Sequence, residues 1–153
     1  MGTRSAFRES AMAKLERNFF RYRVALLISI IFIVPLGYFV RFAQGFGLEW
    51  LYDLLGSVAY EIFWILLVAF IYPKASPLYT AAGVCLATCA IEFLQLWKPP
   101  FLQAARATLI GRLVLGNTFV WSDFISYFVG SFAGWLWMRS VVRFPTSSRS
   151  RES

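Results

Sequence analysis

The sequence predicts an all-α, polytopic membrane protein with four transmembrane helices and an interfacial or re-entrant segment before the last of them. Three observations predict this fold. Apolar residues make up 59% of the 153 residues and charged residues only 15%, whereas soluble domains average roughly 45–50% and about 25%. Several long stretches carry almost no charge and end at a charged residue or a proline. The 16 Phe, 7 Tyr and 6 Trp suit contact with lipid and with the two membrane interfaces.

The chain begins with a basic segment, residues 1–23, which is followed by the first apolar stretch. This segment is expected to form either a short amphipathic helix on the membrane surface or a solvated tail. Residues 24–40 contain no charge and are long enough for a first transmembrane span. Pro35 lies within it and can be tolerated where neighbouring helices satisfy the backbone.

The second and third spans are predicted over residues 56–72 and 78–97. The turn between them, residues 73–77, is so short that the two helices must be antiparallel neighbours. Glu61 lies inside the second span, where a carboxyl group is costly and marks a functional candidate. The third span stops at Lys98-Pro99-Pro100, because proline cannot continue a helix.

Residues 101–119 are apolar but are interrupted by Arg106 and Arg112. Two arginines near the middle make a full crossing costly, so we favour an interfacial or partly re-entrant element over a further span. The fourth span is predicted over residues 124–142 and follows Ser122-Asp123, a plausible helix N-cap. The membrane domain is therefore expected over residues 24–142, with a disordered tail over residues 143–153.

Small residues recur every four positions in the last span, at Ser126, Gly130 and Gly134. This spacing is typical of a face on which helices pack closely. A protein partner or a second copy of the chain would be expected to use it.

The positive charges predict the orientation of the protein. Eleven of the fifteen Lys and Arg residues fall in the N-terminal segment, in the turn at residues 73–77 and in the C-terminal stretch from Arg139 onward. The positive-inside rule places these segments, and both termini, in the cytoplasm. The sequence thus predicts a multi-pass membrane protein with both termini in the cytoplasm. Nucleic acid is not an expected partner, because the arginines flank apolar spans and form no basic stripe on a soluble face.

Antiparallel threading brings the intramembrane charges to a similar depth in the extracytoplasmic half. Glu61, Glu92 and Asp123 lie on three different spans, and Arg106 and Arg112 lie on the adjoining segment. Gln95 follows Glu92 by three residues and shares its helix face. Three interpretations are open: buried ion pairs, Glu92–Arg106 or Asp123–Arg112, that fix the loop; an outward-facing polar cavity that binds an anion; or a path for protons or ions.

Cysteine content does not indicate a metal or redox site. Cys85 and Cys89 are four residues apart on one helix face, which places their Cβ atoms roughly 5–6 Å apart, farther than a disulfide allows. The chain contains no histidine, so zinc would have too few ligands. We expect two free thiols, no metal site and no cofactor.

The segment between Glu92 and Asp123 resembles a known family. Its signature is Ile91-Glu92-Phe93-Leu94-Gln95-Leu96, Arg106-Ala107-Thr108, Gly111-Arg112-Leu113-Val114-Leu115-Gly116, Phe119-Val120-Trp121-Ser122-Asp123 and Tyr127. These residues resemble the bacterial domain-of-unknown-function family 2809, which is similar to the wider VanZ-like membrane proteins. The resemblance implies a small polytopic inner-membrane protein without an established activity. One departure is Ser126-Tyr127, where VanZ-like proteins usually show an asparagine.

These observations together predict an outward-facing polar pocket that recognises an anionic lipid or cell-envelope precursor headgroup. Glu92 and Asp123 are the catalytic candidates, should the protein be an enzyme. The expected binding residues are Gln95, Arg106, Arg112, Glu61 and Thr108. The alternative is a non-enzymatic structural or assembly subunit of a membrane complex.

Overall fold

The computed structural model describes residues 3–42, 49–116 and 118–143. Within these ranges the regular secondary structure is entirely helical, as predicted. The six helices are α1 (Thr3–Phe42), α2 (Glu49–Ile71), α3 (Pro77–Leu94), α4 (Pro100–Ala107), α5 (Leu109–Leu115) and α6 (Trp121–Arg143). The predicted disordered tail lies outside the described residues from position 144 onward.

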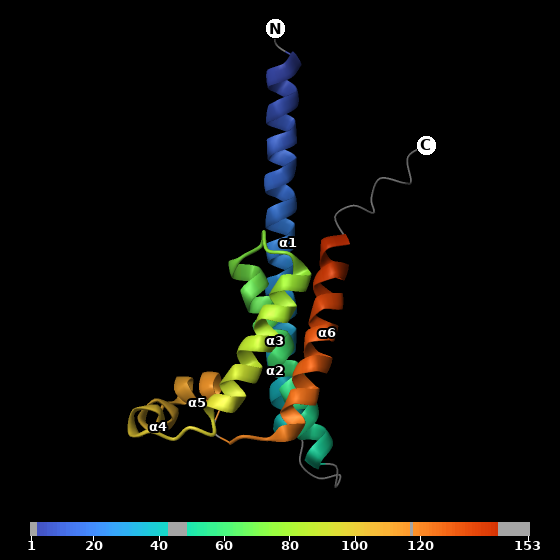
Figure 1. Ribbon diagram of the computed structural model, residues 1–153. Coiled ribbons are helices and arrows are strands. Elements are labelled where there is room, and N and C mark those ends of the chain that lie inside the picture. The colour runs from blue at the N-terminus through green and yellow to red at the C-terminus, as the bar shows by residue number, and fades with distance from the viewer. Residues whose placement is uncertain (1–2, 43–48, 117, 144–153) are drawn as a thin grey trace.

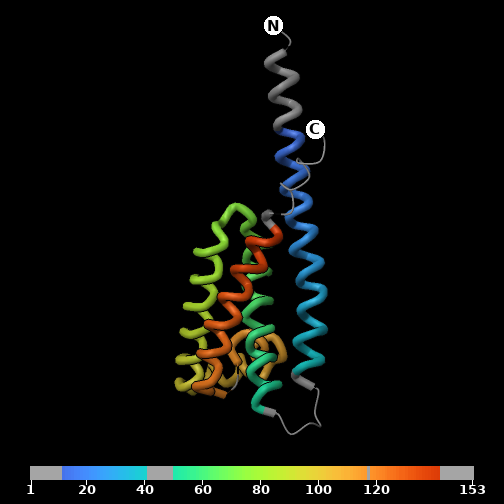
Figure 2. The backbone as a smooth tube through the Cα atoms, turned by 90° about the vertical axis from the view of Figure 1, so that its right-hand side faces the viewer, coloured from blue at the N-terminus to red at the C-terminus, as the bar shows by residue number. Residues whose placement is uncertain are grey.

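Four long helices, α1, α2, α3 and α6, run alongside one another with alternating direction (Figure 1). The tube in Figure 2, which is turned by 90°, shows the same arrangement. Helix α2 is central and contacts α1, α3 and α6. The start of α1, the turn between α2 and α3 and the end of α6 lie at one end of the bundle. The short helices α4 and α5 lie at the other end (Figure 1).

Three of the helices are long and apolar enough to cross a membrane, over Met12–Val40, Trp50–Ile71 and Pro77–Leu94. Helix α6 has 23 residues, as many as α2, but its serines, Asp123 and Arg139 make it more polar than these three. Helix α1 is continuous from the basic segment into the first span and includes Pro35. The amphipathic-helix and solvated-tail interpretations are thus replaced by one long helix over the described part of that segment.

The ambiguous segment after the third span folds as two short helices. Helix α4 has 8 residues and α5 has 7, whereas a transmembrane helix needs about 20. Neither helix can therefore cross the hydrocarbon core. They lie together beside the end of α3 (Figure 1).

The buried core joins α1, α2 and α6 with part of α3. Its members are Leu26, Ile33, Ala59, Ile62, Ile65, Leu66, Ala69, Ala81, Val84 and Met138. Many large apolar side chains point outward instead, among them Phe32, Phe39, Leu86 and Phe132. Exposed apolar surface on this scale is unusual for a soluble monomer and fits contact with lipid.

The packing face on α6 is used inside the chain, which corrects its assignment to a partner. Ser126, Gly130 and Gly134 are buried. A Cβ atom at Gly130 would lie 2.7 Å from the Glu61 Cβ atom, and one at Gly134 would lie 2.9 Å from Ile65 Cδ1. The small residues therefore let α6 approach α2 closely, and this face is not available to another protein.

Candidate functional site

The carboxyl group of Glu92 joins α3 to α6. The Glu92 side chain is 1% exposed. Its Oε1 accepts a hydrogen bond from the Val120 backbone N–H at 2.7 Å, and its Oε2 accepts from the Tyr127 hydroxyl at 3.0 Å and from Gln95 Nε2 at 3.2 Å. Both oxygens thus act as acceptors, for three donors on three segments. A buried polar group that is satisfied in this way stabilises the contact between those segments.

Gln95 continues this network toward the loop before α6. Its amide packs against Gly116, whose φ angle is +65°, a value that residues with a side chain rarely adopt. A Cβ atom at position 116 would overlap the Gln95 amide nitrogen. Gly116 is therefore required by the turn and by the close approach of Gln95. The Gln95 Oε1 atom is buried and has no hydrogen-bond partner among the described residues.

Arg106 caps the end of α3. Its Nη2 donates to the Leu94 carbonyl at 2.9 Å and its Nη1 to the Trp97 carbonyl at 3.2 Å. A cation at this position also interacts favourably with the negative end of the helix dipole. Within the described residues, no ion pair joins Arg106 to Glu92, so the predicted Glu92–Arg106 pair is not present.

The α4–α5 corner is fixed by Thr108. Its hydroxyl donates to the Ala105 carbonyl at 2.7 Å and accepts from the Gly111 N–H at 3.0 Å, which makes it the N-cap of α5. The sequence predicts that Thr108 binds a ligand. In the structure its hydroxyl instead caps the start of α5. It is not among the residues that line the pocket described next.

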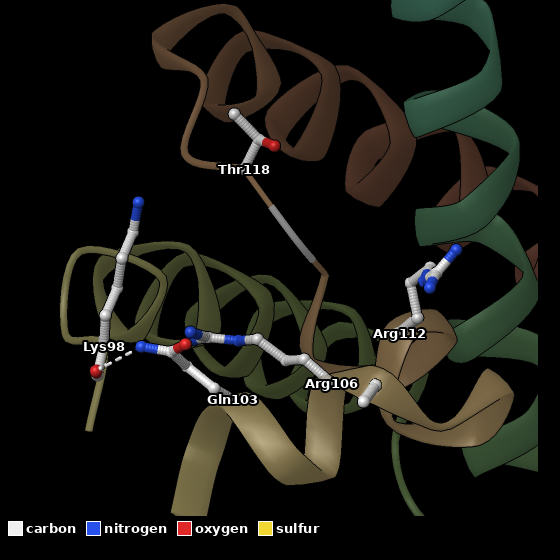
Figure 3. A pocket seen from close by; sticks show the side chains of 6 residues that line it. Lys98, Gln103, Arg106, Arg112 and Thr118 are labelled. Carbon is white, nitrogen blue, oxygen red and sulfur yellow. Dashed lines mark hydrogen bonds between the residues drawn. The ribbon is translucent and has the colours of Figure 1, made fainter. Parts of the chain in front are cut away.

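A basic pocket of about 440 Å³ lies beside this corner. Its lining residues are Lys98, Gln103, Arg106, Ala107, Arg112 and Thr118. Figure 3 shows that these side chains come from the segment after α3, from α4, from α5 and from the linker to α6. Three of them are cations and none is acidic. Gln103 is oriented by a 2.8 Å hydrogen bond from its amide to the Lys98 carbonyl.

Glu61 and Asp123 lie apart from this pocket. Glu61 is fully buried between α2 and α6, where its Oε1 accepts a hydrogen bond from the Ser131 hydroxyl at 2.7 Å. Its Oε2 has no hydrogen-bond partner among the described residues. Asp123 lies in the first turn of α6, which begins at Trp121, so the predicted N-cap at Ser122-Asp123 is wrong. Asp123 accepts a hydrogen bond from the Ser57 hydroxyl at 3.0 Å, so it ties α6 to α2.

The structure thus brings together two of the seven predicted site residues, Arg106 and Arg112, in the basic pocket. Glu92 and Gln95 belong to the adjoining hydrogen-bond network. The sequence interpretation missed Lys98 and Gln103, because the Lys-Pro-Pro motif indicated only a helix end. It also assigned no role to Tyr127, although a tyrosine one turn after Asp123 offers a donor at that depth.

Residues 46–131 match the family described as "Protein of unknown function (DUF2809)". The match covers more than half of the chain and confirms the resemblance drawn from the residues around Glu92. No solved structure matches the chain. The wider relation to VanZ-like proteins stays a prediction.

The Glu92 network predicts the effect of removing one donor. Tyr127→Phe deletes the hydroxyl that bonds Glu92 Oε2 and should lower the free energy of unfolding by about 1–3 kcal/mol, the cost of leaving a buried acceptor less satisfied. The measurement is reversible unfolding in mixed micelles. Tyr79→Phe is the matched control, because Tyr79 is exposed, and it should have no effect. Equal stabilities of the two variants would contradict the role given to Tyr127.

Proposed function

The chain belongs to the DUF2809 family of proteins of unknown function, and we propose that it recognises the anionic headgroup of a lipid or cell-envelope precursor in its basic pocket. The observation that carries this proposal is the lining of the pocket, with three cations and no carboxylate. Positive charge next to a hydrocarbon phase is costly unless an anion accompanies it. Phosphate and carboxylate groups are the natural partners of arginine in such a site.

The hydrogen bonds of Arg106 support this assignment. A guanidinium has five N–H donors, and two of the Arg106 nitrogens donate to the carbonyls of Leu94, at the end of α3, and of Trp97, in the segment after it. The Arg106 Nε atom is buried and has no hydrogen-bond partner among the described residues. An unpaired buried donor costs free energy, so Arg106, which lines the pocket, retains the capacity to donate a further hydrogen bond. Lys98 and Arg112 are exposed at the same pocket and add positive charge that would attract an anion.

Glu92 acts in this proposal as a positioning residue. Its carboxyl group is occupied by three donors, is hardly exposed and does not line the pocket, so it is not placed to contact a ligand there. It instead fixes the linker before α6, where Thr118 lines the pocket. Asp123 fixes the start of α6 through Ser57. The function proposed is therefore recognition of a headgroup, and no reaction is assigned.

We propose that α6 is the fourth span and that the pocket faces outward from a bacterial plasma membrane. The antiparallel arrangement in Figure 1 supports this topology. The start of α1, which projects beyond the bundle, the α2–α3 turn and the end of α6 are all on the same side of it, and these parts of the chain account for most of the positive charge. By the positive-inside rule that end is cytoplasmic. We also propose that the protein is related to the VanZ-like membrane proteins.

Headgroup recognition predicts a loss of affinity when the exposed cations are neutralised. Lys98→Gln and Arg112→Gln should each raise the dissociation constant for sn-glycerol 3-phosphate about threefold to tenfold, the effect of losing one interaction of ordinary hydrogen-bond strength at an exposed position. The loss should shrink at high ionic strength, because salt screens exposed charges. Titration calorimetry on the purified protein measures it. Lys14→Gln, which neutralises an exposed cation on α1, should bind like the unaltered protein. Identical affinities in all four proteins would reject the pocket as the binding site.

The topology predicts opposite labelling of two positions. Gln103→Cys lies on exposed α4, and Ala75→Cys lies in the exposed α2–α3 turn. In intact cells a membrane-impermeant maleimide should label Gln103→Cys and leave Ala75→Cys unlabelled until the cells are opened. The parent protein, with its native Cys85 and Cys89, controls for background labelling. Labelling of both positions from outside would refute the four-span arrangement.

A further inference from the structure

A second hollow lies between α2 and α3, at the end of the bundle away from the basic pocket. It has a volume of about 400 Å³. Its lining is almost entirely apolar and consists of Val68, Tyr72, Ala75, Tyr79, Thr80, Gly83, Val84 and Ala87. A Cβ atom at Gly83 would meet no other atom within 4 Å. The hollow is therefore an open groove along α3, with two small residues, Gly83 and Ala87, in its wall.

One polar atom in the wall of this groove has no partner. Thr80 is 6% exposed, and its hydroxyl forms no hydrogen bond among the described residues. Hydroxyls inside helices usually bond the carbonyl one turn earlier. Thr88 does so with the Val84 carbonyl, and Ser29 does so with the Ala25 carbonyl. The Thr80 hydroxyl differs from these, and Thr80 lines the groove, so a rotation of this buried side chain would offer its donor to an occupant.

A cation lies in the turn at the same end of the bundle as the groove. Lys74 is exposed between α2 and α3 and directly precedes the lining residue Ala75. Along the chain the order is thus a cation, then a buried hydroxyl, then the small residues Gly83 and Ala87. Tyr72 and Tyr79, at the same end, are aromatic residues of the kind that mark a membrane interface.

We propose that this groove binds one diacyl phospholipid from the leaflet at this end of the bundle. The phosphate would lie near Lys74, an ester carbonyl would accept the Thr80 hydrogen bond, and an acyl chain would run past Gly83 and Ala87. This order of groups is the order found in the lipid. The site is separate from the basic pocket, and the inference does not depend on headgroup recognition there.

Thr80 favours a lipid over a helix from another protein. An apolar helix would present hydrocarbon side chains to the groove, and these carry no acceptor for the Thr80 hydroxyl. A lipid ester carries carbonyl oxygens that can accept this hydrogen bond. The charge of Lys74 complements a phosphate and adds nothing to the packing of an apolar helix.

The test compares ester-linked and ether-linked phosphatidylglycerol of the same chain length, because the ether lipid lacks the carbonyl. Each lipid is titrated into the full-length protein in detergent, and bound lipid is quantified by native mass spectrometry. Thr80→Val keeps the side-chain shape and should weaken binding of the ester lipid about threefold to tenfold, as expected for one hydrogen bond. It should leave the ether lipid unaffected. Binding in the basic pocket is common to both proteins and cancels in the comparison.

A second pair of variants tests the groove itself. Gly83→Leu fills the open space and should remove one bound lipid per chain, whereas Ala82→Leu, at an exposed position of α3 outside the lining, should not. The proposal is overturned if Thr80→Val affects both lipids equally or neither. It is also overturned if Gly83→Leu leaves the lipid count unchanged, including the case in which it abolishes a dimer instead.

Discussion

The Glu92 carboxyl group lies among apolar helices and could not remain there without hydrogen-bond donors, because an unsatisfied polar group in a membrane interior costs several kcal/mol. Its donors come from the end of α3, from the linker and from the second turn of α6. The bond to the Val120 N–H also satisfies a backbone group just before α6, where helical bonds are not yet available. One carboxyl group thus fixes how the last helix enters the bundle.

The same contact determines where the basic pocket forms. With the linker held at Glu92, α4 and α5 fold beside the end of α3, and Arg106 donates to the Leu94 and Trp97 carbonyls there. Gly116 lets the chain turn back against Gln95. The two acids therefore accept hydrogen bonds inside the bundle. Glu92 binds the linker before α6, and Asp123 binds Ser57 on α2. The cations of α4, α5 and the preceding loop are left to face the pocket, which explains its uniform charge.

Much of the fold could be predicted from the sequence, because apolar stretch length and proline positions report directly on membrane helices. The α4–α5 pair could not, because its break depends on the Thr108 cap and on a contact between Gly111 and the Ala105 carbonyl. Because Arg106 and Arg112 were expected at a similar depth in the membrane, the sequence placed them at one site, and both line the basic pocket.

Depth alone could not distinguish residues that face a pocket from residues that face another helix, since that depends on how each helix is rotated about its axis. Glu61 is such a case, because it faces α6 and Ser131. The small-residue spacing on α6 correctly indicated close packing but did not identify α2 as the neighbour.

The most direct test of this account is a solid-state NMR distance measurement in lipid bilayers between the side-chain carboxyl carbon of Glu92, labelled with ¹³C, and the backbone nitrogen of Val120, labelled with ¹⁵N. The account predicts a strong dipolar coupling, because the Glu92 Oε1 atom lies 2.7 Å from that nitrogen. Absence of a measurable coupling in the folded protein would contradict it, since the linker, α6 and the basic pocket would then be positioned by other contacts.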